Sequence, residues 1–390
     1  MSSTFQPVSL QEWEQTVRKQ LKTEDIYSIL KKENLEHLDV RPYYNSVAQP
    51  LPNLPKIEES THLVSPFYEE WQDEAYAFLL KENVSGLEDK ALFIDSQELA
   101  EHLTPEESNT YLCLVDIIDD NAGTLNEQLG KELLAKGFDR SLCVDISLHQ
   151  NAGAGILHQL GIALAKTKEL TEVFGAQVLD QLIFRIAAGA NYFFEIAKIR
   201  AFKILFNQFS KEFGRDDIPY IFVETSLRNK SLHDEENNLI RSTLELAAGM
   251  IGGADALYST AYKINTITPL SDEISFKQQI VLAYESIINV FEDAANGSYY
   301  VEELTRQIAE KSWAYFLETE EKGGYLALAQ KAEIQKTIYD DAVSEQKWVE
   351  EGKIKLIGVN MYPKLELKKS ATELYSEYEL KPVRWAEAYE

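Results

Sequence analysis

Short, nearly continuous apolar runs alternate with amphipathic segments of helical periodicity along most of this chain. Strands buried on both faces have such runs, and strands separated by helices pair in parallel through right-handed crossovers. The pattern predicts strands at 91–95, 111–118, 142–148, 182–187, 220–225, 256–260 and 355–360, with an eighth near 297–301. It predicts helices near 8–22, 69–83, 123–136, 153–174, 191–213, 235–250, 272–294, 301–318 and 325–351.

Repeated strand–helix units with no Gly-x-Gly-x-x-Gly motif after the first strand favour one fold class. They indicate a closed (β/α)8 TIM-type barrel rather than a doubly wound sheet. Prolines concentrate between residues 40 and 66, where each removes a backbone donor and disfavours helix at the preceding residue. We therefore expect an N-terminal extended and helical arm over residues 1–66, followed by the barrel over residues 67–365.

The segment 191–213 is apolar over most of its helical surface and leaves only a narrow polar stripe. A helix with this pattern is covered on more than one side. The second cover could be another chain or a neighbouring helix of the same barrel, and the pattern does not separate the two.

A net charge of −26 makes nucleic acid and anionic membrane surfaces unfavourable partners. It would also repel an anion such as coenzyme A unless a local basic patch received it. Cys113 and Cys143 lie in apolar strand-like runs and are expected to be buried, reduced thiols. The first residues do not resemble a secretory signal, and no apolar run approaches the roughly 20 residues of a membrane helix, so a cytoplasmic location is expected.

Carboxylates end several expected strands, at Asp95, Asp145, Glu224 and in the run 116–120. In a barrel such positions face the active site, and oxygen ligands suit magnesium, so a metal-dependent lyase is one interpretation. The favoured interpretation is that these carboxylates are ordinary turn and helix-capping residues, because Asp and Asn are common at the start of a helix. The histidine spacing matches no zinc motif, and His149, which follows a strand, is expected to be structural rather than an acid or base.

Small residues gather at 152–155, 187–190 and 247–256, and none of these pieces matches a phosphate-binding loop. Gly153 and Gly189 could leave an axial hole in the barrel or present backbone amides to an anion. Tight helix–strand packing explains the same glycines equally well.

Five segments, in order, resemble the methylmalonyl-CoA mutase family. Residues 184–209 (FRIAAGANYFFEIAKIRAFKILFNQF) match a strand ending in Gly-x-Asn before an aromatic helix with Glu-[Ile/Val]-Ala-Lys-[Leu/Ile]-Arg. Residues 237–257 resemble the family's Asn-Asn-x-x-Arg helix, and 297–305 its Gly-Ser-x-Tyr-Val-Glu-x-Leu-Thr segment. Residues 357–362 resemble its last barrel strand, and 384–390 the start of its interdomain linker.

The resemblance implies a barrel pierced along its axis by the pantetheine chain of an acyl-CoA. Gly153, Gly189 and Asn191 would then line the acyl-CoA tunnel. Family members are isomerases that convert methylmalonyl-CoA to succinyl-CoA with adenosylcobalamin, which sits on the carboxyl face of the barrel. A separate cobalamin domain carries an Asp-x-His-x-x-Gly motif.

The chain departs from this family at its polar chemistry. Active members have His-x-Gln-Thr-Ser-Gly at a strand end, where this sequence has Phe222, Glu224 and Leu227 in place of His, Gln and Gly. Gln150 survives from a second active-site motif that has lost its Tyr-His pair, and Gln279 replaces an arginine. Phe222 cannot donate a hydrogen bond to a thioester carbonyl, and Glu224 would repel an anionic substrate. No catalytic residue and no metal ligand is expected.

These losses predict a barrel-only, non-catalytic small subunit that supports the large subunit of a heterodimeric methylmalonyl-CoA mutase. No Asp-x-His-x-x-Gly occurs, so residues 366–390 would begin a linker toward an absent cobalamin domain. Adenosylcobalamin would bind through the partner, and the arm would wrap that partner. An alternative is an acyl-CoA mutase barrel that is active only with a separate cobalamin-binding chain.

Overall fold

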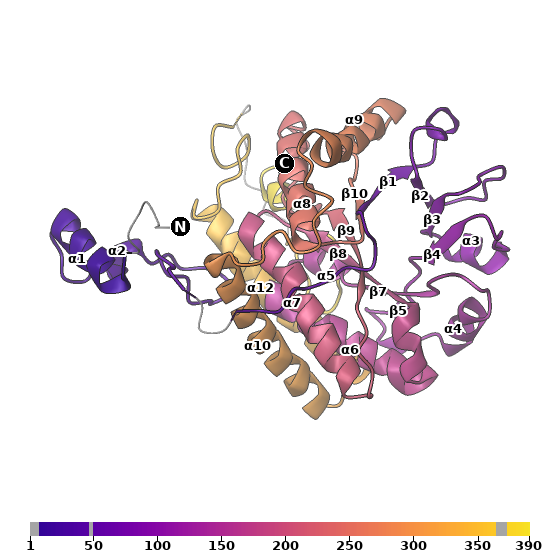
Figure 1. The fold of residues 1–390 in the computed structure, drawn as a ribbon, viewed down its shortest axis with the longest axis horizontal. Helices are drawn as coiled ribbons and strands as arrows, with labels where there is room; N and C mark the ends of the chain where they lie inside the picture. Colours follow the sequence, from indigo (N-terminus) through magenta and orange to yellow (C-terminus); the bar gives the residue numbers. More distant parts are fainter. Residues whose placement is uncertain (1–7, 47–49, 364–372) are drawn as a thin grey trace, which may run out of the picture.

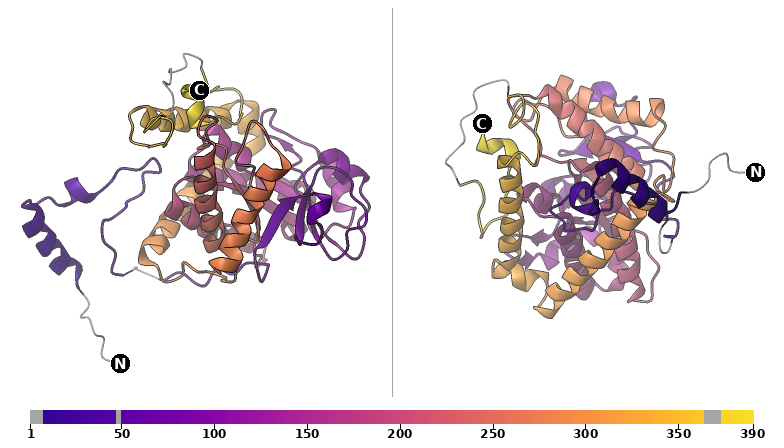
Figure 2. Two further views of the ribbon diagram at one scale, coloured as in Figure 1. Left: turned by 90° about the horizontal axis from the view of Figure 1, so that it is seen from above. Right: turned by 90° about the vertical axis from the view of Figure 1, so that its left-hand side faces the viewer.

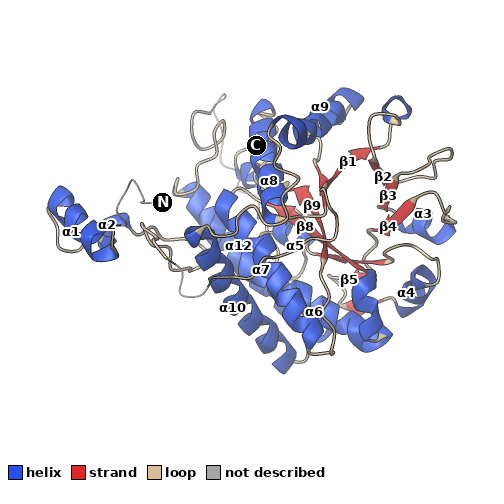
Figure 3. Cartoon of the chain, viewed as in Figure 1, coloured by secondary structure: helices blue, strands red, loops and turns tan. Residues whose placement is uncertain are grey.

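The computed structural model describes residues 8–46, 50–363 and 373–390, and its centre is a parallel barrel (Figures 1 and 3). Eight strands pair in the order β4-β3-β2-β1-β10-β9-β8-β7, every pair parallel. Their bounds are β1 His62–Pro66, β2 Ala77–Leu80, β3 Ala91–Ile94, β4 Thr110–Cys113, β7 Leu142–Asp145, β8 Leu182–Ala188, β9 Tyr220–Thr225 and β10 Ala256–Tyr258.

Two isolated bridges close the sheet between its outermost strands. Leu112 pairs with Arg140, and Asp116 pairs with Cys143, both in parallel. The amide of Cys113 donates to the Arg140 carbonyl at 2.9 Å, so the ladder continues from β4 to β7. The predicted (β/α)8 TIM-type barrel is therefore confirmed, with its strands in sequence order around the ring. Both cysteines are buried and free, as expected.

Helices cover the barrel unevenly. The helices that follow β3, β4, β7, β8 and β9 are α3 Gln97–His102, α4 Glu127–Leu134, α5 Ser147–Ala152, α6 Ile156–Phe174, α7 Tyr192–Lys211 and α8 Glu236–Gly252. After the last strand come α9 Pro269–Ile280, a π turn at Val281–Glu285, α10 Tyr299–Glu321, α11 Tyr325–Gln330 and α12 Glu333–Glu350. No described helix is long and apolar enough to cross a membrane.

Helix α10 lies outside α6 and α7 and packs on both, which adds a further layer there (Figure 1). Phe209 of α7 meets Phe316 of α10 edge-on at 5.9 Å between ring centroids. A helix of the same chain therefore supplies the second cover of α7, which settles the alternative left open by its apolar surface.

The first two strands lie where the sequence indicated an arm and a helix. Residues 62–66, assigned to the arm, form β1 and pair with β2 and β10. The helix expected at 69–83 is wrong, because this stretch holds a short 3-10 turn at Glu69–Trp71 and then β2. Four apolar residues are too few to show a period, so only burial on both faces decides between strand and helix.

The strands expected at 355–360 and 297–301 are also wrong. Residues 299–301 begin α10. Ile357 forms only an isolated bridge to Met361, and Gly358 between them has a φ of +83°, which marks a tight turn. The barrel is already complete at β10, so neither segment has an open sheet edge to join.

The N-terminal arm leaves the barrel beside α10 and carries α1 (Leu10–Leu21) and α2 (Tyr27–Leu30) away from it (Figure 2). Neither helix has a buried residue. Nearer the barrel, the Glu36 carboxylate accepts the amide of Ile156 at 2.8 Å at the start of α6. Gln307 and Lys311 of α10 bind the arm backbone at Asp39 and His37. Hydrogen bonds therefore hold the arm to the barrel at residues 36–39, whereas α1 and α2 have no buried residue.

Candidate functional site

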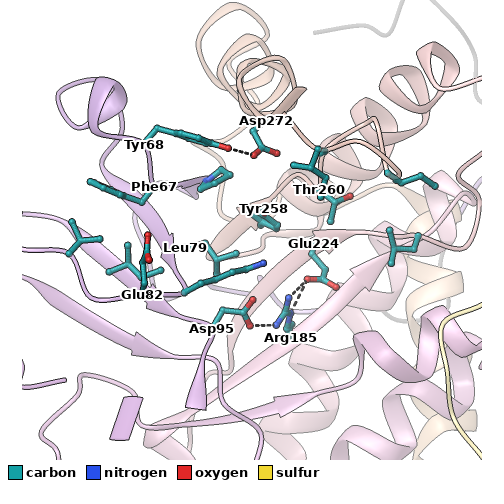
Figure 4. Close-up of a pocket in the computed structure, with 18 residues that line it drawn as sticks. Phe67, Tyr68, Leu79, Glu82, Asp95, Arg185, Glu224, Tyr258, Thr260 and Asp272 are labelled. Carbon is teal, nitrogen blue, oxygen red and sulfur yellow. Dashed lines mark hydrogen bonds and ion pairs between the residues drawn. The ribbon is translucent and has the colours of Figure 1, made fainter. Parts of the chain in front are cut away.

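A cavity of about 700 Å³ opens at the carboxyl ends of β1, β2, β3, β8, β9 and β10 (Figure 4). This is the end of a barrel where the loops that follow the strands build binding sites. Most of its wall is apolar, and polar groups gather on its floor and at its rim. The lining residues are Pro66, Phe67, Tyr68, Leu79, Leu80, Lys81, Glu82, Val84, Asp95, Arg185, Glu224, Leu227, Tyr258, Thr260, Ala261, Ile264, Ile267 and Asp272.

Arg185 of β8 lies at the centre of the floor between two carboxylates (Figure 4). Its Nε and Nη2 donate to Glu224 Oε2 at 2.8 and 2.6 Å, and its Nη1 donates to Asp95 Oδ1 at 2.7 Å. Asp145 Oδ2 lies 3.9 Å from Nε. Three carboxylates therefore surround one guanidinium, and its positive charge is already matched inside the protein.

Burial sets the ionisation of these groups. Burial raises the pKa of Glu224, although Arg185 opposes that rise. For Arg185, burial alone would lower the pKa, but Glu224, Asp145 and Asp95 raise it well above its usual value. The guanidinium is therefore charged at every physiological pH and stays bound to its carboxylates.

At the rim, the Tyr68 hydroxyl donates to Asp272 Oδ2 at 2.7 Å, which joins the loop after β1 to α9 (Figure 4). Burial and this hydrogen bond raise the pKa of Tyr68 to about 12. Tyr68 therefore stays neutral, and the bond braces one side of the opening.

Below the cavity, side chains fill the axis of the barrel. Tyr220, Phe222 and Glu224 alternate along β9 with the same facing, so the glutamate reaches the cavity while both rings lie beneath it. Phe222 is fully buried and meets Phe93 of β3 with ring centroids 5.1 Å apart. The interior cluster consists of Val64, Ala77, Leu79, Ala91, Phe93, Leu112, Leu114, Cys143, Ile183, Tyr220, Phe222 and Ala256.

The amino end of the same axis is closed by Tyr220. Its hydroxyl lies 3.4 Å from His62 Nδ1, and the Arg140 guanidinium covers its ring at 5.3 Å from the centroid. His62 Nε2 in turn lies 3.4 Å from a Glu58 carboxylate oxygen. With Phe93 and Phe222 above this layer, the cavity is a blind pocket that is reached from the carboxyl face.

The other half of the carboxyl face is covered by α11, α12 and the last residues of the chain. The Val383 amide donates to the Asn151 carbonyl at 2.9 Å, and the Trp385 amide donates to the Arg228 carbonyl at 2.8 Å. Arg228 is buried and also binds Glu345 of α12 at 2.6 Å. Residues 373–390, expected as part of a linker, thus pack on the loops after β7 and β9, while 366–372 lie outside the described residues.

The four positions expected to be remnants of an active site lie in four different environments. Glu224 lines the cavity, and Phe222 belongs to the interior cluster beneath it. Gln150 of α5 lies in the covered half, where it accepts a hydrogen bond from Ser226 at 3.0 Å. Gln279 of α9 is fully buried and donates to the Val64 carbonyl at 3.1 Å. Their origin as a degenerate catalytic site stays a prediction.

The three residues expected to line an acyl-CoA tunnel lie outside the interior cluster. Gly153 ends α5, and a Cβ there would lie 2.5 Å from the Ala342 Cβ of α12. A Cβ on Gly189 would lie 3.0 Å from a Glu195 carboxylate oxygen. Asn191 is exposed just before α7. Close packing accounts for both glycines, and a role in acyl-CoA binding stays a prediction.

Replacing Gly153 by alanine is expected to lower the free energy of unfolding by about 2–4 kcal/mol, measured by urea denaturation. Its φ of +113° disfavours any side chain, and the added methyl group would collide with α12. Gly86→Ala is the control, because its φ is +81° but no atom lies within 4 Å of the added carbon. For Gly86→Ala we expect a loss of about 1–2 kcal/mol in the free energy of unfolding. Equal losses at the two positions would contradict the packing role of Gly153.

The acidic run after β4 belongs to a buried ionic cluster beside the barrel. Lys166 Nζ binds Asp116 Oδ2 at 2.7 Å and Asp120 Oδ1 at 2.8 Å, and the Tyr325 hydroxyl donates to Asp120 Oδ1 at 2.6 Å. His149 Nε2 lies 2.8 Å from that hydroxyl, and burial lowers the pKa of His149 to about 4. These carboxylates hold a lysine of α6, and no three described His, Cys, Asp or Glu residues are arranged to hold a metal ion.

Arg185 is the site residue that the sequence analysis missed. It stands in the run LIFRIAA, where its neighbours on both sides are buried. An arginine inside a strand that is buried on both faces needs a partner, and this is the signal that could have identified it. Tyr68, Tyr258 and Asp272 carried no comparable signal, because the loop after β1, the end of β10 and α9 bring them to the cavity.

The molecule is thus a closed parallel (β/α)8 barrel with a blind cavity at its carboxyl mouth and a filled axis. Residues 140–386 match the family described as methylmalonyl-CoA mutase, so the chain belongs to the methylmalonyl-CoA mutase family. The resemblance found in the sequence is confirmed.

Its relatives include both kinds of subunit. The methylmalonyl-CoA mutase small subunit of Porphyromonas gingivalis is 30% identical over 226 residues, which are 55% of this chain and 37% of that protein. The small subunit of Propionibacterium freudenreichii subsp. shermanii is 30% identical over 197 residues, 47% of this chain and 31% of that protein. The large subunit from the same organism is 30% identical over 192 residues, which are 48% of this chain and 26% of that protein. The matched part is about a third of the length of these relatives or less.

Proposed function

We propose that this chain is the non-catalytic small subunit of a heterodimeric, adenosylcobalamin-dependent methylmalonyl-CoA mutase. The observation that carries the proposal is the closed axis of the barrel. Phe222 and Phe93 meet in its middle, and Tyr220 closes its amino end. A pantetheine chain running along that axis would have to displace buried aromatic rings, each of which gains roughly 1.5–3 kcal/mol from burial.

The chemistry of the cavity supports the same proposal. A thioester rearrangement needs a hydrogen-bond donor at the carbonyl oxygen, and Arg185, whose side chain is 15% exposed, is the cation on the cavity floor. Its charge is already matched by Glu224 and Asp95. The carboxylate of methylmalonyl-CoA would meet a floor on which two lining carboxylates face one guanidinium, which disfavours its entry.

The lining residues also do not fit adenosylcobalamin. The cavity wall contains neither histidine nor cysteine, so it offers cobalt neither an imidazole nor a thiolate. The sequence contains no Asp-x-His-x-x-Gly motif. We therefore assign the cofactor to the large subunit. What this chain would contribute is surface: α1 and α2 have no buried residue and extend from the barrel as an arm for that partner.

The alternative, a barrel that becomes active with a separate cobalamin-binding chain, has one observation in its favour. The cavity opens at the carboxyl face, where such a chain would meet the substrate in members of this family. Direct binding of methylmalonyl-CoA separates the two functions. A small subunit of the proposed kind should show no saturable binding, whereas a split mutase should bind the thioester before the second chain is added.

The decisive experiment is a turnover and assembly assay. The purified chain, given adenosylcobalamin and methylmalonyl-CoA, is expected to form no succinyl-CoA. Mixed with a mutase large subunit, it is expected to elute as a heterodimer in size-exclusion chromatography. Deleting residues 1–30 is the matched variant, and the exposed arm helices predict a weaker complex with an unchanged barrel. Succinyl-CoA formation by the chain alone would refute the proposal.

A further inference from the structure

The floor of the mouth cavity carries more negative than positive charge. Two lining carboxylates, Asp95 and Glu224, lie 2.7 and 2.6 Å from the single guanidinium of Arg185. Asp145 does not line the cavity and lies 3.9 Å from the same guanidinium. At the rim, Lys81 is offset by Glu82, and Asp272 adds a further carboxylate. A cavity with this balance attracts a cation and repels an anion, most strongly at low ionic strength.

Glu224 has one oxygen that the protein leaves without a hydrogen bond. Both bonds from Arg185 go to Oε2, and no described residue donates to Oε1. Yet Glu224 is only 7% exposed and lines the cavity (Figure 4). Oε1 is therefore free to accept a hydrogen bond from a donor that enters the cavity.

The walls above this oxygen suit an apolar body attached to such a donor. Phe67 and Tyr258 supply aromatic faces, and Leu79, Leu80 and Ile264 complete an apolar wall. Aromatic faces also attract organic cations through the quadrupole of the ring. The volume of about 700 Å³ lies within the range of small-molecule sites, and the closed axis limits entry to the carboxyl face.

We propose that the mouth cavity binds a compact organic cation, a primary ammonium carried on an aromatic or aliphatic body. The ammonium donates to Glu224 Oε1 and lies against the Asp95 carboxylate, while the body packs between Phe67 and Tyr258. Binding involves no covalent step. It is also independent of the assembly with a large subunit, so either proposal can fail while the other stands.

Three ligands of matched shape test the charge preference with the unmodified protein. Phenethylammonium, phenethyl alcohol and 3-phenylpropionate are titrated into the full chain at low salt and neutral pH, and binding is followed by calorimetry. The ammonium is expected to bind saturably and at least tenfold more tightly than the alcohol, with no binding of the carboxylate. Equal affinity for ammonium and alcohol, or tighter binding of the carboxylate, would overturn the proposal.

A pair of charge-removing variants locates the site. Glu224→Gln keeps an oxygen for Arg185 but removes one negative charge, so affinity for phenethylammonium should fall at least tenfold and affinity for the alcohol should stay the same. Glu212→Gln is the control, because Glu212 is exposed beyond the end of α7 and does not line the cavity. Circular dichroism melting checks that both variants fold. An equal loss of binding in both variants would show that the cation binds the acidic surface at large and not this cavity.

Discussion

Replacing Lys166 by methionine is expected to lower the free energy of unfolding by about 3–5 kcal/mol. Lys166 is fully buried in α6 and holds the carboxylates of Asp116 and Asp120, with a third bond of 3.0 Å to the Asp145 carbonyl. Methionine keeps most of the side-chain volume but leaves two buried carboxylates without a cation. The cost follows from that unpaired charge and not from a cavity.

Urea denaturation at neutral pH measures this effect, and Lys168→Met is the matched control on the same helix. Lys168 is partly exposed and pairs with Glu172 and Glu320 near the surface, where ion pairs contribute less than about 1 kcal/mol. Acidification should reduce the difference in the free energy of unfolding between the Lys166 variant and the natural chain. In the natural chain burial raises the pKa of Asp116 to about 6, although Lys166 opposes that rise. Without Lys166 the pKa of Asp116 in the folded variant is higher still, so the folded variant takes up a proton there before the natural chain does as the pH falls. A loss below 1 kcal/mol at position 166 would contradict the buried-cluster interpretation.

Phe222→Ala is expected to lower the free energy of unfolding by about 3–5 kcal/mol, because truncating a buried ring leaves a cavity that the barrel cannot close. Phe222 is fully buried between Phe93 and Tyr258, with ring centroids 5.1 and 6.5 Å away, and the Arg185 guanidinium lies 5.9 Å above its ring. The same substitution also tests the proposed function, since it removes the ring that blocks the axis at the level of the floor.

The control for this substitution is Phe291→Ala. Phe291 is 52% exposed in the loop before α10, so its truncation should cost less than about 1 kcal/mol. Both losses come from urea denaturation of the purified chain. Similar values for the two variants would mean that Phe222 is not a packed interior residue, and the closed axis would lose its main support.

The closed axis and the acidic floor support the proposal of a barrel that keeps the family scaffold without its polar chemistry. Phe222 packs where the family resemblance places a histidine, and Glu224 binds Arg185 where it places a glutamine. The two changes are complementary, since the Phe222 ring fills the barrel axis beneath the cavity and the Glu224 carboxylate pairs with the Arg185 guanidinium. A single reversion to histidine would therefore not restore a donor aimed at a thioester.

The sequence by itself determined the fold class, the family and six of the eight strands. Strands such as β8 and β9 are long, apolar and bounded by clear helices, and their period and length leave one interpretation. The motif around residues 184–209 identified the family from residue order alone, and the resemblance predicts that Phe222 stands in place of a hydrogen-bond donor.

Only the tertiary structure decided the identity of β1 and β2, the partner of α7 and the character of the site. HLVSP and AFLL are too short to carry a period, and they become strands because two neighbours in the barrel offer them open edges. Arg185, Glu224 and Asp95 stand on β8, on β9 and just after β3, far apart in the chain. Sequence patterns report which faces are buried, whereas the charge balance of a cavity depends on which strand ends meet across the barrel.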